Sequence, residues 1–111
     1  AKGEVRFLSV ASFTKSGKDI HNLIRGLSSV PGAYCFLSDK RLKIYRSSQT
    51  NIKSKNIPGT IEKIDKTGIY VNTIDNLIIF TDIKLEGKKR CLVSDFINGI
   101  NVKDYIGKVL K

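Results

Sequence analysis

The side chains that could do chemistry in this sequence are mainly cations. Its 20 lysine and arginine residues exceed its 10 aspartate and glutamate residues, which gives a net charge of +10. Two basic clusters stand out, one at residues 40–55 and one at residues 84–90. A small domain this basic usually meets phosphate in RNA, in DNA or on an anionic membrane. A coding bias toward lysine would raise the charge without any such partner, and this alternative stays open.

The candidate RNA-binding residues are the cations of these two clusters. They are Lys40, Arg41, Lys43, Arg46, Lys53, Lys55, Lys84, Lys88, Lys89 and Arg90. Polar and apolar residues alternate over residues 41–46, which predicts a half-buried strand. Its outer face would carry Arg41 and Lys43, while Leu42 and Ile44 would face the core. Phosphate contacts from this face would position RNA without reading its bases. A solvated, lysine-rich strand face is the simpler alternative.

Catalytic and metal-binding groups are sparse. His21 is the only histidine, and its helical neighbour at i+4 is Arg25, which is a poor setting for a general base. Cys35 and Cys91 lack the spacing of zinc ligands, and buried free thiols are favoured over a disulfide. We therefore expect no catalytic residue, no metal and no cofactor in this domain.

Aromatic residues and one helical arginine give weaker indications. Tyr34, Tyr45 and Tyr70 lie in strand-like runs, where an exposed tyrosine can stack on an unpaired base. Most strand tyrosines simply pack, so stacking is the less favoured interpretation. Arg25 could contact phosphate, but a structural role in attaching its helix is favoured.

An amphipathic helix is the first element that must position these groups. Four apolar residues at i, i+3, i+4 and i+7 predict a helix over residues 17–28. They are Ile20, Leu23, Ile24 and Leu27. Ser16 and Asp19 form a capping-box pattern at its start. Pro31-Gly32 cannot continue the helix and leads directly into a strand.

Strand patterns then follow at short spacing. Residues 33–38 and 41–46 predict one hairpin, and residues 60–65 and 68–73 predict another. Residues 77–85 form the most apolar run and should be a central strand. We expect a polar loop at residues 47–56. Near the end, Ser94 should cap a short helix at residues 95–98 that Gly99 terminates, and the tail after it is weakly patterned.

These elements predict a mainly β fold. We expect a small OB-fold-like antiparallel barrel with an N-terminal amphipathic helix and a short helix near the C-terminus. The pattern supports an SH3-like barrel nearly as well. Residues 1–11 would be a linker or an extra strand, and residues 12–111 the barrel domain. No run of 18 apolar residues is present, so no membrane span is expected.

Six short motifs follow one another in order between residues 12 and 99. The first has the pattern I-x-N-x-I-R-x-L-x-x-x-P-G-A, with Ile20, Asn22, Ile24, Arg25, Leu27, Pro31, Gly32 and Ala33 in its slots. The others are K-R-L-K-I-Y-R at residues 40–46, P-G-T-I at 58–61, G-I-Y-V-N-T at 68–73, E-G-K-K-R at 86–90 and D-F-I-N-G at 95–99. Together these motifs resemble the C-terminal domain of methionyl-tRNA formyltransferase. The chain departs from that family at Ser29-Val30, at Lys84 and in its first eleven residues.

The resemblance implies a function that composition alone does not. The domain would bind initiator tRNA, while a separate N-terminal catalytic domain would transfer the formyl group from formyltetrahydrofolate. It would not be an enzyme on its own, it would need no cofactor, and it would work in the cytoplasm without contact to a membrane. One alternative is a structural C-terminal domain of a sugar- or folate-type formyltransferase with no nucleic-acid role. Reuse as a general RNA-binding module also stays open.

Overall fold

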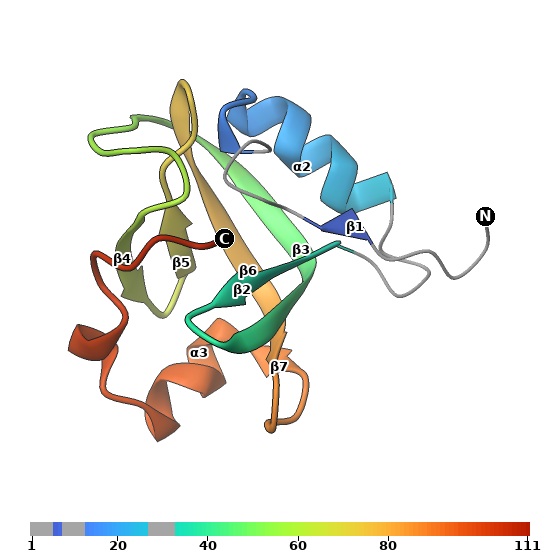
Figure 1. Ribbon diagram of the computed structural model, residues 1–111, viewed down its shortest axis with the longest axis vertical. Coiled ribbons are helices and arrows are strands. Elements are labelled where there is room, and N and C mark those ends of the chain that lie inside the picture. The colour runs from blue at the N-terminus through green and yellow to red at the C-terminus, as the bar shows by residue number, and fades with distance from the viewer. Residues whose placement is uncertain (1–5, 8–12, 27–32) are drawn as a thin grey trace.

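The fold is mainly β, in a computed structural model that describes residues 6–7, 13–26 and 33–111 (Figure 1). In chain order the elements are β1 (Arg6–Phe7), α2 (Gly17–Gly26), β2 (Ala33–Leu37), β3 (Lys40–Lys53), β4 (Ile61–Asp65), β5 (Gly68–Val71), β6 (Asn76–Leu85), β7 (Cys91–Leu92), α3 (Val93–Phe96) and 3-10 turns at Ile97–Gly99 and Val102–Asp104. The strands form one sheet in the order β1-β2-β3-β6-β5-β4, and β7 pairs with β6. The β1–β2 pair is parallel and the others are antiparallel. The predicted fold class is confirmed.

Helix α2 begins as its capping pattern predicts. The Asp19 amide donates to Ser16 Oγ at 3.1 Å. Ile20 and Ile24 are each 1% exposed, and Leu23 packs against the same core at its edge. Figure 1 shows the helix lying along β3. The predicted contribution of Leu27 and the Pro31-Gly32 stop lies outside the described residues.

A carboxylate far along the chain anchors the start of α2. Asp75 Oδ1 accepts a hydrogen bond from the Gly17 amide at 2.8 Å. Thr73 Oγ1 and the Asn76 amide also donate to Asp75 Oδ1, at 2.9 Å and 2.6 Å. Because these bonds favour the charged carboxylate, led by the one from Gly17, they lower the pKa of Asp75. The helix is thereby fixed to the turn that precedes β6.

The expected central strand is β6, and its pairing corrects one prediction. Residues 47–56 do not form a loop throughout, because β3 continues to Lys53 and pairs with β6 as far as Asn76. The apolar β6 needs a hydrogen-bonding partner along its length, so the polar half of β3 forms a strand despite lacking apolar alternation. The Thr50 hydroxyl adds a 2.6 Å bond to the Leu77 carbonyl.

The helical turn near the C-terminus starts earlier than predicted. α3 begins at Val93, and its N-cap position is Leu92, which makes no side-chain capping bond. Ser94 therefore lies within the first turn, and its predicted capping role is wrong. The apolar side chains decide the start, because Val93 and Phe96 are both buried. The 3-10 turn that follows ends at Gly99, as predicted.

The weakly patterned tail is a structural part of the domain. The backbones of Phe36 and Lys111 exchange two hydrogen bonds, of 2.7 Å and 3.0 Å. On its other side the tail bonds to Ile61 through the Lys108 carbonyl at 2.8 Å. Leu110 is fully buried in the core. The last residues therefore connect β2 to β4, the two strands near opposite ends of the sheet order.

One continuous core holds these elements together. It is built from the inward faces of α2, the strands, α3 and the tail. Gly68 marks its tightest strand contact, since a Cβ atom there would lie 2.5 Å from the Phe80 carbonyl oxygen. Cys35 is part of this core, and its thiol is free. Burial raises the pKa of this thiol through desolvation. Cys91 is free as well and only partly buried.

Candidate nucleic-acid interface

The outer face of β2, β3 and β6 gathers part of both basic clusters. Leu42 and Ile44 are 0% and 1% exposed, so the alternation predicted for this strand is confirmed. Their neighbours Arg41 and Lys43 face outward. The β3–β6 register pairs Lys43 directly with Lys84, which unites cations 41 positions apart in the sequence. The two predicted clusters thus meet on one sheet face.

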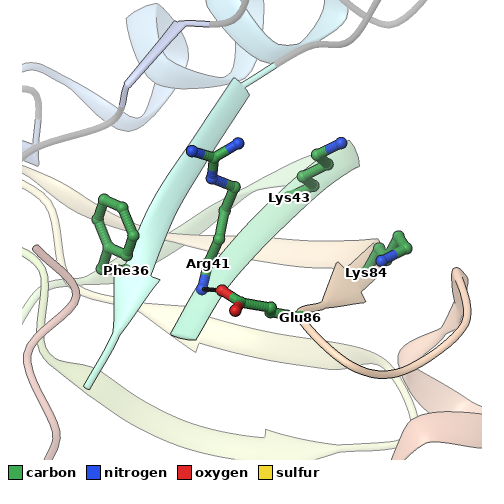
Figure 2. A pocket seen from close by; sticks show the side chains of 5 residues that line it. All are labelled: Phe36, Arg41, Lys43, Lys84 and Glu86. Atoms are coloured by element: carbon green, nitrogen blue, oxygen red, sulfur yellow. Dashed lines mark hydrogen bonds between the residues drawn. The ribbon is translucent and has the colours of Figure 1, made fainter. Parts of the chain in front are cut away.

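These side chains surround an open cavity of about 390 Å³, here called the Arg41 cavity. Its lining residues are Phe36, Arg41, Lys43, Lys84 and Glu86. Figure 2 shows the Arg41 side chain between Phe36 and Lys43, with Lys84 farther along β6. Three cations and one carboxylate therefore share the site, which leaves it with a net positive charge.

The carboxylate that lines the cavity is hydrogen-bonded to the backbone. Glu86 Oε1 accepts a hydrogen bond from the Arg41 amide at 2.9 Å (Figure 2). The Glu86 amide in turn donates to the Arg41 carbonyl at 2.8 Å. These bonds join the end of β6 to the start of β3. Glu86 therefore bonds to the backbone of Arg41 and not to its guanidinium group.

Aromatic rings hold the Arg41 guanidinium in place. Its Cζ atom lies 4.5 Å from the centroid of the Tyr34 ring. The Tyr34 and Phe36 rings meet edge to face, with centroids 5.9 Å apart and an interplanar angle of 85°. A cation over an exposed ring gains about 0.5–1 kcal/mol, which restricts the long side chain. A restrained guanidinium suits phosphate because its planar fork can donate two parallel hydrogen bonds.

Phe36 and Glu86 are the lining residues that sequence reasoning did not assign to the site. The signal was present, because strand alternation puts Phe36 on the same face as Tyr34. The three tyrosines proposed for stacking each carry a cation over the ring: Arg41 on Tyr34, Arg90 on Tyr45 at 4.0 Å and Lys63 on Tyr70 at 4.3 Å. Tyr70 is also buried, so the structure favours packing for that ring.

Several predicted cations lie away from the Arg41 cavity. Lys40 lines a separate hollow with the hairpin turn and Lys108. Lys53 and Lys55 lie at the other end of β3, where the Lys55 amide donates to buried Asn72 Oδ1 at 2.8 Å. Lys88 and Lys89 border a shallow hollow beside α3. These five residues stay predictions as RNA contacts.

Arg90 is engaged within the domain. Its Nε and Nη2 atoms donate to Asp82 Oδ1 and Oδ2 at 3.1 Å and 2.9 Å. Those bonds to the mostly buried carboxylate raise the pKa of Arg90. The guanidinium also covers the Tyr45 ring. The ion pair gives both oxygens of the Asp82 carboxylate a hydrogen-bond donor and orders the β6–β7 turn. The position of Arg90 next to Lys88 and Lys89 in the sequence does not reveal this role.

His21 and Arg46 meet at a second cavity, between α2 and β3. His21 Nδ1 lies 2.8 Å from Ser47 Oγ, which ties the helix to the strand. Among residues 13–26 and 33–111, no three His, Cys, Asp or Glu side chains converge on a possible metal position. In that same part of the chain, no helix is long and apolar enough to cross a bilayer.

Fold and site together define a small, basic β domain with a cationic sheet face backed by aromatic rings. Residues 9–101 match the family model of the formyl transferase C-terminal domain, and the chain belongs to this family. It is similar to methionyl-tRNA formyltransferase of Malacoplasma penetrans (strain HF-2), with 47% identity over 90% of this chain and 31% of the relative. The corresponding enzyme of Clostridioides difficile (strain 630) is 38% identical over 82% of this chain and 29% of its own length. That of Staphylococcus aureus (strain Newman) is 39% identical over 89% and 32%.

These matches confirm the resemblance to the C-terminal domain of methionyl-tRNA formyltransferases that the six motifs indicated. The chain spans about a third of the length of these relatives. The motifs identify the domain through its helix, turns and strands. The cations of the Arg41 cavity are the part of that framework best suited to contact a phosphate-bearing partner.

Proposed function

We propose that this domain binds tRNA through the outer face of β2, β3 and β6. The observation that carries the proposal is the convergence of Arg41, Lys43 and Lys84 on one cavity with only Glu86 as an acidic lining residue. Similarity to proteins named methionyl-tRNA formyltransferase supplies the class of nucleic acid. The finer form of the proposal is that the bound molecule is an initiator tRNA.

The domain's task would be to position the tRNA for chemistry done elsewhere. A separate N-terminal catalytic domain would use formyltetrahydrofolate, and the domain described here would contribute no cofactor and no catalytic group. The proposed role is a cytoplasmic one. The +10 charge supports this role over a purely structural domain of a sugar- or folate-type formyltransferase, because such a domain has no need for excess cations.

The proposal is tested by titrating the domain with fluorescently labelled initiator tRNA at several salt concentrations. If about five phosphates are neutralised, the slope of log K against log salt should be about −4. An elongator tRNA and a sulfated polysaccharide of equal charge serve as controls. Binding without salt dependence, or binding of the polysaccharide as tight as that of tRNA, would overturn the proposal. Equal binding of both tRNAs would reduce it to a general RNA-binding role.

A further inference from the structure

A second cavity, of about 330 Å³, lies where α2 packs on β3. Its described lining residues are His21, Arg25, Tyr45, Arg46 and Ser47, and the hollow is here called the His21 cavity. None of these lining residues is acidic. The cavity therefore combines two guanidinium groups, an imidazole and two hydroxyl groups, which is a donor set suited to an anion.

A distortion of β3 builds this cavity. The β3–β6 register shifts between Ile44 and Arg46, and again between Arg46 and Ser47. In a regular strand, Tyr45 and Arg46 would point to opposite faces of the sheet. Here both residues line the same hollow, together with Ser47. Such irregularities redirect side chains and are common beside binding sites.

The helix completes the donor set from the other side. His21 and Arg25 are four positions apart on α2 and so share a face. The 2.8 Å contact between His21 Nδ1 and Ser47 Oγ fixes the imidazole against β3. No carboxylate in the described part of the chain forms an ion pair with Arg46. A bound anion would give the Arg46 guanidinium a charged partner inside the cavity.

We propose that the His21 cavity is a second phosphate site, which holds a phosphodiester of the same RNA strand that crosses the Arg41 cavity. The inference rests on the proposed function. Lys43 and Arg46 are three residues apart on β3, which corresponds to about 10 Å along a strand. One RNA strand running along β3 can therefore reach both cavities, and Arg46 can donate two parallel hydrogen bonds to a phosphate. The RNA strand would be bound at two points, which fixes the line that it follows across the sheet as well as its position.

The test compares Arg46→Gln with Lys66→Gln. Both substitutions remove one exposed cation, but Lys66 lies in the β4–β5 turn, lines neither cavity and is not a candidate RNA contact. Binding of labelled tRNA is measured by fluorescence anisotropy from 0.05 to 0.4 M salt. Loss of one phosphate contact should reduce the salt slope by about 0.9, which is about an eightfold loss of affinity at 0.1 M salt. Lys66→Gln should change affinity by less than about twofold, because its charge acts only at long range.

A second measurement uses inorganic phosphate as the probe. In NMR spectra of the 15N-labelled domain, phosphate should shift the Arg46 Nε–H signal, and tRNA should shift it further. An unshifted signal with both ligands would overturn the second site. A shift with phosphate but not with tRNA would also overturn it, because the cavity would then bind free anions only.

The two proposals fail in different ways. If Arg46→Gln behaves like Lys66→Gln while charge removal in the Arg41 cavity weakens binding, the second site is wrong and the proposed function stands. If neither cavity affects tRNA binding, the proposed function fails as well.

Discussion

Removing the cations of the Arg41 cavity should weaken tRNA binding in a salt-dependent manner. The variant Arg41→Gln/Lys43→Gln/Lys84→Gln replaces three positive side chains that converge on one hollow of about 390 Å³. Because they converge, they should neutralise one or two phosphates and not three. The salt slope should therefore fall by about 0.9 to 1.8. At 0.1 M salt, this change corresponds to about an 8- to 60-fold loss of affinity.

The assay for this variant is the anisotropy titration of labelled initiator tRNA over a range of salt. A control variant, Lys18→Gln/Lys66→Gln/Lys103→Gln, removes the same charge from three exposed lysines that lie outside the cavity and are not candidate RNA contacts. The cavity variant also loses the contact of Arg41 with Tyr34, which should cost about 0.5–1 kcal/mol of unfolding free energy. Urea denaturation measures that cost separately from binding.

Two results would refute the reasoning about this face. An equal loss of affinity in the control variant would mean that binding follows total charge and not the arrangement of β2, β3 and β6. A weakened affinity with an unchanged salt slope would mean that the three cations do not act through phosphate. In either case the Arg41 cavity would lose its assigned role.

Two further predictions concern stability. Gly68→Ala should lower the unfolding free energy by about 3 kcal/mol, because its Cβ atom would collide with the Phe80 carbonyl, while Gly99→Ala, with open space around it, should change it by less than about 0.5 kcal/mol. Urea melts showing similar stability for the two variants would contradict the tight β5–β6 contact. Asp75→Asn should weaken the anchor between residue 75 and the Gly17 amide. Because the pKa of Asp75 is lower in the folded state, the stabilisation that its charged carboxylate gives the fold is complete above the unfolded-state pKa. That stabilisation is lost as pH falls through the folded-state pKa. The difference in unfolding free energy between wild type and variant should therefore begin to shrink as pH falls below about 4, and a constant difference down to pH 2 would exclude this carboxylate as the cause.

Local patterns in the sequence predicted most of the elements. The capping pair Ser16 and Asp19, the alternation at residues 41–46 and the apolar run of β6 all appear where expected. Each is a short-range effect, since it depends on residues a few positions apart. Local patterns gave a wrong prediction where a distant strand determines the local structure. The polar half of β3 is a strand because β6 pairs with it.

The sequence by itself determined the family, the basic character and the face of β3 that carries Arg41 and Lys43. Six ordered motifs and strand periodicity were enough for these, because both are properties of the linear chain. Only the tertiary structure decided which cations act together. The antiparallel register brings Lys84 opposite Lys43, and an ion pair with Asp82 engages Arg90. These outcomes depend on contacts between residues far apart in the sequence, and such contacts leave no local pattern to read.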